Sequence, residues 1–262
     1  MANWLERLKF NLRTPVVLAI ALLFWSSLAV AGTLSVIGET RWVQVEYVYD
    51  GDTFKTTTGE RIRLLGINAP EVMHGSKPGQ IMGNAATREL KSMIAGKVVR
   101  LGFDVQRHDV YGRTLAQVWL HNGTWVDGEM VRRGFAHVYT FTPNLRWAEK
   151  LIELERPARS QRLGIWHTKR FTVLRASQVK PSHIGQFHVV TGTINQIMHN
   201  GFGFRLDRLN ISIPRKYRVW FKPRPHLRMG ETVTVHGVIR AGHTDSLYLA
   251  LHSPFDLETR TR

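Results

Sequence analysis

The sequence contains no cysteine. Disulfide frameworks, thiolate metal sites and cysteine nucleophiles are therefore excluded. An exported protein can do without disulfides when its cores are large enough, so this absence leaves the compartment open. The chain also lacks a Walker phosphate loop and a G-x-S-x-G elbow, which argues against an NTPase and a serine hydrolase.

Acidic residues are scarce. The chain of 262 residues has 20 Asp and Glu against 36 Lys and Arg, which gives a formal net charge of +16. Such an excess favours binding to polyanions such as nucleic acid, or to an anionic membrane surface. A basic surface that only confers solubility is the alternative. The twelve histidines show no HxxxH spacing of metal ligands, and we expect most of them to be surface or half-buried residues.

Residues 1–37 read as an export signal or a membrane anchor. Met1 to Arg13 carries three basic residues and one acidic residue, and Thr14 to Gly38 carries no charge. Ala29 to Ala31 fits a small-residue cleavage site, but the apolar run is also long enough to span a bilayer. The two interpretations stay open. Both predict that the rest of the chain is exported, either periplasmic or secreted, or anchored to the membrane with that part outside.

Residues 38–168 have the pattern of a five-stranded oligonucleotide-binding (OB) barrel with helical additions. A helix is expected between the third and fourth strands, with Asn84 as its cap, and Pro157 should kink or divide the last helix. The expected strands are Trp42–Tyr49, Asp52–Thr57, Arg61–Ile67, Val98–Asp104 and Leu115–His121, and the expected helices are Asn84–Ala95, Val126–Arg133 and Trp147–Arg162.

A second, smaller all-β barrel, also OB-like, is expected at residues 186–256. Residues 169–185 are polar and basic and read as a linker, and residues 257–262 as a tail. The fold class is therefore mainly β with α additions. Strand signals recur at hairpin spacing in the second barrel, over Phe187–Ile197, Phe202–Ile213, Glu231–Arg240 and Ser246–His252.

Polar groups gather at the ends of two strands in Val48 to Glu71, which reads VYDGDTFKTTTGERIRLLGINAPE. Asp and Asn offer oxygens to a hard cation, and Arg forks onto phosphate oxygens. The motifs DGDT, RIRLLGINAPE and DVYGR together resemble the staphylococcal nuclease family over Trp42 to Trp166. The second barrel looks like the accessory domain of some bacterial members.

The resemblance implies a metal-dependent, sugar-nonspecific nuclease that cleaves DNA and RNA and leaves 3′-phosphate ends. It implies that Asp52, Asn68 and the backbone carbonyl of Ala69 bind Ca²⁺ directly. Asp50 would support these ligands without contacting the ion. No protein partner is inferred, and the membrane is a partner only if the leader is retained.

The same resemblance assigns the catalytic roles. Glu71 would position or deprotonate the attacking water, and Arg63 and Arg113 would stabilise the transition state. Tyr139 and Phe141 would stack on a base, which tolerates any base, although Phe141 could equally be a core residue. Basic residues that could line the phosphate path are Lys77, Lys91, Lys97, Arg100 and Arg107.

Asn68 departs from the family pattern, which has aspartate at this position. The site therefore has one negative charge fewer, which predicts weaker metal binding or another divalent preference. The alternative function is a non-catalytic nucleic-acid-binding envelope module on a nuclease-like scaffold. Retention of Glu71, Arg63 and Arg113 favours the enzyme.

Overall fold

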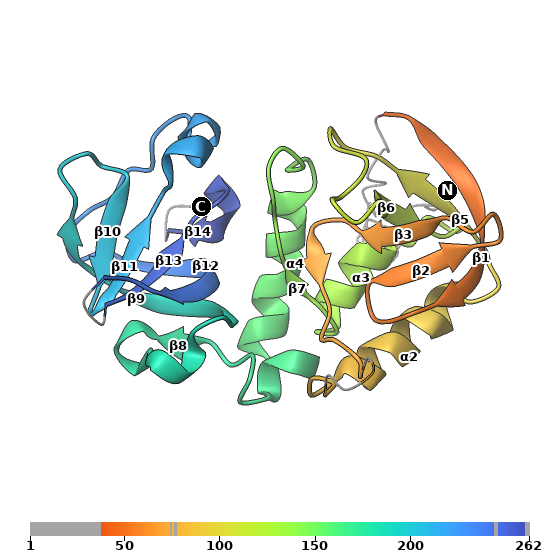
Figure 1. Ribbon diagram of the computed structural model, residues 1–262, viewed down its shortest axis with the longest axis horizontal. Coiled ribbons are helices and arrows are strands. Elements are labelled where there is room, and N and C mark those ends of the chain that lie inside the picture. Colours follow the sequence, from red (N-terminus) through yellow and green to blue (C-terminus); the bar gives the residue numbers. More distant parts are fainter. Residues whose placement is uncertain (1–37, 74, 76–77, 244–245, 260–262) are drawn as a thin grey trace, which may run out of the picture. The chain divides into compact units, whose positions relative to one another are not determined.

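A computed structural model describes residues 38–73, 75, 78–243 and 246–259 (Figure 1). The predicted export signal or membrane anchor lies outside these residues. Within the part that the structure describes, no helix is both long and apolar enough to cross a membrane.

Five strands close into the first barrel in the order β1-β2-β3-β6-β5. The pairing of β3 with β6 is parallel, and the other pairings are antiparallel. Alternating side chains fill the interior, where Phe54, Ile62 and Leu101 are fully buried. The strands are β1 (Thr40–Val48), β2 (Thr53–Thr56), β3 (Arg61–Leu64), β5 (Val98–Gly102) and β6 (Thr114–Trp119).

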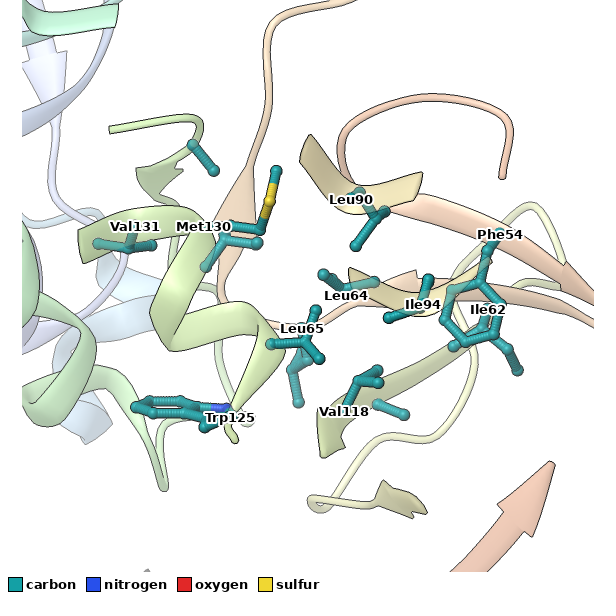
Figure 2. Packing of buried hydrophobic residues seen from close by; sticks show 14 of the residues in the cluster. Phe54, Ile62, Leu64, Leu65, Leu90, Ile94, Val118, Trp125, Met130 and Val131 are labelled. Atoms are coloured by element: carbon teal, nitrogen blue, oxygen red, sulfur yellow. The ribbon is translucent and has the colours of Figure 1, made fainter. Parts of the chain in front are cut away.

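Three helices accompany this barrel: α2 (Gly83–Ile94), α3 (Val126–Arg132) and α4 (Ala148–Ser160). Helix α2 lies between the third and fourth barrel strands, as expected. Figure 2 shows its Leu90 and Ile94 beside Leu64 of β3 in the core. The burial of such apolar side chains is the main source of stability for this packing.

Two details of the helices differ from expectation. Helix α2 begins at Gly83 after Met82, which has a φ of 74°, and no side chain caps it, so the prediction that Asn84 caps it was wrong. Helix α4 contains Pro157 and continues to Ser160, so the proline does not divide it, and the alternative of a kink stays a prediction. Its packed face, which includes Leu151 and Ile152, offsets the backbone hydrogen bond that proline removes.

A short two-stranded sheet positions the candidate site. Strand β4 (Ile67–Asn68) pairs with the antiparallel strand β7 (His137–Val138), and Asn68 lies opposite His137. The chain between α3 and α4 is therefore brought beside the chain that leaves β3.

The second barrel repeats the strand order of the first. Strands β9-β10-β11-β13-β12 form a ring that the β12–β9 pairing closes, and β11 and β13 are parallel, as β3 and β6 are. This confirms the second, OB-like barrel. The strands are β9 (Phe187–Ile197), β10 (Gly203–Leu206), β11 (Leu209–Ser212), β12 (Thr232–Ala241) and β13 (Leu247–Ala250), with β8 (Leu174–Arg175) and β14 (Leu257–Glu258) at the edges.

Other expectations for this half need correction. The predicted strand Phe202–Ile213 is a hairpin of β10 and β11 that turns at Asp207, which has a φ of 50°. Aspartate tolerates this left-handed conformation better than most residues. The expected linker, 169–185, contains β8 and short 3₁₀ helices, and the expected tail contributes β14. The domain boundaries themselves stay predictions.

Charged side chains join helix α4 to the second barrel. Arg159 Nη2 and His236 Nε2 lie 2.5 and 2.6 Å from Oε1 of Glu258 on β14. Arg156 Nε lies 2.5 Å from the other carboxylate oxygen. Burial alone would raise the pKa of Glu258, but the hydrogen bond and charge of His236, together with Arg159, hold that pKa well below its ordinary value of 4.5.

Replacing Glu258 with Gln should destabilise the fold. The largely buried guanidinium of Arg159 would lose its carboxylate, which costs about 3 kcal/mol of unfolding free energy. Because the folded pKa is lowered, this stabilisation is present above the ordinary value of 4.5 and is lost as pH falls below it. Urea unfolding at pH 7 and at pH 4 measures both effects.

Glu153→Gln is the matched control, because Glu153 pairs with Lys150 on the same helix and both side chains are about half exposed. Its effect should stay below about 0.5 kcal/mol. Equal destabilisation by the two substitutions would contradict a specific role for Glu258.

Candidate active site

The turn between β1 and β2 is held against two other elements. The backbone N–H of Asp52 donates to Oδ1 of Asp50 at 2.9 Å, which closes the turn. A Cβ on Gly51 would lie 2.6 Å from the β-carbons of Ala69 and of Ala86 on α2. Only glycine fits this approach, so the DGD sequence places both carboxylates beside the end of β4.

The carboxylate of Asp52 is buried and compensated. Asp52 is 6% exposed. Its Oδ2 accepts a hydrogen bond from the backbone N–H of Ala69 at 2.7 Å, and its Oδ1 lies 3.0 Å from Nε of Arg63. A buried charge is tolerated when it is paired and hydrogen-bonded in this way.

The guanidinium of Arg63 links β3 to β4. Nη1 donates to the carbonyl oxygens of Leu64 and Ile67 at 2.5 and 2.8 Å. Nη2 donates to Oδ1 of Asn68 at 2.9 Å. With the ion pair to Asp52, these contacts fix the side chain, so oxygens of Asp52 and Asn68 converge on one positive group.

His137 orients the amide of Asn68. The ring is 1% exposed, and Nδ1 lies 3.0 Å from the carbonyl oxygen of Val138. A carbonyl can only accept, so Nδ1 carries the proton and Nε2 accepts from Nδ2 of Asn68, 3.4 Å away. Burial lowers the pKa of His137 to about 3, in agreement with a neutral ring. The amide oxygen of Asn68 is thereby directed to Arg63.

The sequence did not reveal this histidine. We expected most of the histidines to be surface or half-buried, and His137, His188 and His236 are exceptions that are buried. Only the β4–β7 pairing, between residues far apart in the chain, brings His137 to Asn68.

The carboxylates outnumber the positive charge in this cluster. Burial, and next the charge of Asp52, raise the pKa of Asp50 to about 6. When both carboxylates are ionised, Arg63 balances only one of them, so the cluster favours an additional cation.

The donor set suits a hard divalent cation. Asp50 and Asp52 offer carboxylate oxygens, Asn68 an amide oxygen and Ala69 a backbone carbonyl, which are the ligands that Ca²⁺ prefers. Among the residues that the structure describes, no three His, Cys, Asp or Glu side chains group as metal ligands. The amide and the carbonyl would therefore have to complete the set.

Glu71 follows this cluster with an exposed side chain. Its carbonyl oxygen accepts from the backbone N–H of Gln80 at 2.8 Å, and a Cβ on Gly83 would lie 2.3 Å from that oxygen. The backbone of Glu71 is thus packed against the start of α2. The carboxylate makes no hydrogen bond or ion pair with any described residue, so it is available to a water molecule or a substrate.

Arg113 lies beside the cluster but is not bonded to it. Its Nε donates to Oδ2 of Asp109 at 2.7 Å, and the guanidinium lies 5.5 Å from the ring centre of Tyr111. Leu115, two residues on, pairs with Arg63. By strand geometry the backbones of Arg63 and Arg113 are therefore about 8 Å apart. Within the described residues, no hydrogen bond joins Arg113 or Glu71 to the Asp52–Arg63–Asn68 group.

Tyr139 and Phe141 lie near each other, with ring centres 6.4 Å apart. Tyr139 is 37% exposed, and its edge-on partner Phe187, from β9 of the second barrel, has its ring centre 6.0 Å away. Phe187 also stacks on His137 at 4.0 Å. Phe141 packs against the core of the first barrel, so of the two Tyr139 is the better placed to meet a base.

The other basic residues proposed for the phosphate path are mostly engaged. Lys97 donates to the carbonyl oxygen of Met93 at 2.6 Å, and Arg107 pairs with Glu39. The remaining positions are Lys91 over the ring of Tyr47, Arg100 over the rings of Trp42 and Trp119, and Lys77, which lies outside the described residues.

Comparisons with known proteins place this chain among its relatives. The family model described as "Staphylococcal nuclease homologue" matches residues 61–168. A thermonuclease of Staphylococcus intermedius is 34% identical over 125 residues, which cover 47% of this chain and 74% of that protein. An uncharacterized endonuclease of Escherichia coli O157:H7 is 38% identical over 126 residues, 47% of this chain and 75% of that protein.

A further relative, the thermonuclease of Staphylococcus hyicus, is 31% identical over 122 residues, which cover 45% of this chain and 72% of that protein. The family model includes Arg63, Asn68, Glu71 and Arg113 and ends before the second barrel. With three-quarters of the length of such relatives matched and an OB barrel that carries the motif residues, this chain belongs to the staphylococcal nuclease family.

Proposed function

We propose that the protein is an exported, metal-dependent, sugar-nonspecific nuclease that hydrolyses phosphodiester bonds in DNA and RNA. The observation that carries the proposal is the convergence of the Asp52 and Asn68 oxygens on Arg63, with the exposed Glu71 three residues after Asn68. Its family supports nuclease chemistry. Export rests on the sequence of residues 1–37.

Asp52, Asn68 and the carbonyl of Ala69 would hold Ca²⁺, and Asp50 would lie behind them. When bound, the ion would neutralise charge on the phosphoryl oxygens. Asn68 makes another divalent metal possible, because the set has fewer negative ligands than the family pattern.

The protein's own groups divide the remaining work. Glu71 would position the attacking water and accept its proton, since its carboxylate is free of partners among the described residues. Arg63 and Arg113 would stabilise the negative charge that builds on the phosphoryl oxygens. Tyr139, with Phe141 beside it, would stack on a base without reading its identity.

The two arginines would contribute differently. A guanidinium has five N–H donors, and Arg63 already directs four of them to Asp52, Leu64, Ile67 and Asn68. Arg113 directs only Nε to Asp109, and its η nitrogens have no hydrogen-bond partner among the described residues. Arg113 therefore has more donors available to the substrate, and Arg63 has the larger structural role.

One observation favours a second candidate, a non-catalytic nucleic-acid-binding module. The oxygen of Asn68 already accepts from Arg63, and its amide nitrogen faces His137, so this ligand is neutral and engaged. Such a module would bind DNA in a salt-dependent way without turnover.

Digestion of single-stranded DNA should require a divalent metal and Glu71. We expect cleavage with Ca²⁺ and none with EDTA, and Glu71→Gln should lower kcat by about 10²-fold or more, because the base is lost. Gel analysis of end-labelled DNA measures this. Folded protein that leaves the DNA equally intact with Ca²⁺ and with EDTA would support the binding module instead.

Arg113→Ala should lower kcat by about 10²-fold with little change in stability. Arg63→Ala should lower activity as well and should also cost about 3 kcal/mol of unfolding free energy, because Asp52 would stay buried without its partner. Kinetics and urea unfolding of both variants test this difference. Equal losses of stability in the two variants would show that Arg63 does not have a larger structural role than Arg113.

Asn68→Asp should raise Ca²⁺ affinity about tenfold or more, because one ligand gains a full charge. It should also lower stability by about 1–3 kcal/mol, since a carboxylate oxygen would face the unprotonated Nε2 of His137. Calcium titration of activity and thermal unfolding measure the two effects.

Asn122→Asp is the control for Asn68→Asp. It adds the same charge in an exposed turn, where the side-chain oxygen still accepts from the N–H of Thr124. Unchanged calcium dependence in Asn68→Asp, with the control also unchanged, would show that residue 68 does not bind the metal.

A further inference from the structure

The connection between β11 and β12 of the second barrel carries an unusual concentration of positive charge. Residues 213–230 of this connection contain six Lys and Arg and no Asp or Glu. We call residues 215–228 the basic segment. Its positive side chains are Arg215, Lys216, Arg218, Lys222, Arg224 and Arg228.

These cations are not neutralised by neighbouring carboxylates. All six Lys and Arg residues of the basic segment are exposed except Arg218. None of the six forms an ion pair with a carboxylate of the described chain. In the first barrel, by contrast, exposed arginines such as Arg41 and Arg132 pair with Glu60 and Glu129. The basic segment therefore presents charge that a polyanion can use.

Aromatic groups are interleaved with these charges. Trp220 is 39% exposed and Val219 57% exposed. The guanidinium carbons of Arg218 and Arg224 lie 4.3 and 4.4 Å from the ring centre of Phe202. Phe202 thus contacts two arginines, and Trp220 is partly exposed to solvent.

Through Arg218 and Arg224, which contact Phe202, the segment reaches the edge of the part of an OB barrel that generally binds oligonucleotides. That part comprises strands 2 and 3 and the loop before strand 2. Here these are β10, β11 and the loop that ends at Phe202 (Figure 1). Arg205 of β10 and Asn210 of β11 meet across the two strands, where Nε of Arg205 donates to Oδ1 of Asn210 at 3.3 Å.

A cavity of about 350 Å³ adjoins the segment. Arg224, His226 and Arg228 line it together with Phe221 and the carboxylate-bearing Glu231. Its volume is in the range of small-molecule sites. A base fits a cavity of mixed apolar and polar lining, and phosphates would lie on the arginines, away from Glu231.

We propose that the basic segment and the β10–β11 face form a second site, which binds single-stranded nucleic acid through phosphate contacts and base stacking. The partly exposed Trp220 would stack on such bases, because every base has a stacking face. A lipid surface is less suitable, since three prolines at 214, 223 and 225 prevent the continuous amphipathic helix that interfacial binding uses. The site would hold the substrate for the first barrel. This role in holding substrate rests on the proposed nuclease function, whereas the binding itself does not.

The test measures binding of labelled oligo(dT) by fluorescence anisotropy at several salt concentrations. The full chain carries Glu71→Gln so that the DNA survives. Combining Arg215→Ala, Lys222→Ala and Arg224→Ala should weaken binding at least tenfold and reduce the salt slope by about 2, the value for three phosphate contacts on a single strand. Trp220→Ala should weaken binding about tenfold and leave the slope unchanged.

The control removes three paired, exposed cations instead, by Arg132→Ala, Arg133→Ala and Lys150→Ala. It should retain most of the affinity, and circular dichroism checks the fold of each variant. Parental affinity and slope in the basic-segment variant would overturn the proposal. The proposal would also be overturned if the basic-segment variant lost binding to phosphatidylserine–phosphatidylcholine vesicles but kept its affinity for oligo(dT).

Failure of the proposed nuclease function remains distinguishable. Absence of metal-dependent digestion by the parent chain would refute that function, whereas oligo(dT) binding that depends on the basic segment would still establish the second site.

Discussion

The guanidinium of Arg63 is the group on which the candidate site depends. It contacts an oxygen of Asp52 from the first turn and an oxygen of Asn68 from β4, and it closes the chain between them through the carbonyls of Leu64 and Ile67. Without it, the buried carboxylate of Asp52 would lack its counter-charge. The same geometry that stabilises the loop presents oxygens to a cation, so structure and proposed chemistry share one set of contacts.

The second barrel contacts residues that position this site. Phe187 of β9 stacks on His137, which in turn orients Asn68. The N–H of Val138, the next residue, donates to Oε1 of the buried Glu155 at 2.6 Å, and Arg159 connects this helix to Glu258 of β14. Positions near residue 68 are therefore coupled to a barrel outside the matched family region, which gives that barrel a structural role as well as the proposed binding role.

Local patterns predicted much of this arrangement. The predicted strand Phe187–Ile197 matches β9 to the residue, and the order of strands and helices predicted the OB barrel. The clustering of Asp50, Asp52, Arg63 and Asn68 could be predicted because they are close in sequence, and their roles stay predictions. His137 and Glu258 were not, since their contacts depend on pairings between distant segments. The turn at Asp207 was missed because its left-handed conformation follows from the hairpin and not from a glycine.

A crystal structure of the full chain with Ca²⁺ and a non-hydrolysable phosphorothioate dinucleotide tests the central claim most directly. The account predicts one cation bound by oxygens of Asp52, Asn68 and Ala69, with a phosphate between it and the η nitrogens of Arg113 and with Glu71 facing that phosphate. A cation bound elsewhere, or a dinucleotide that meets neither Arg113 nor Glu71, would contradict it.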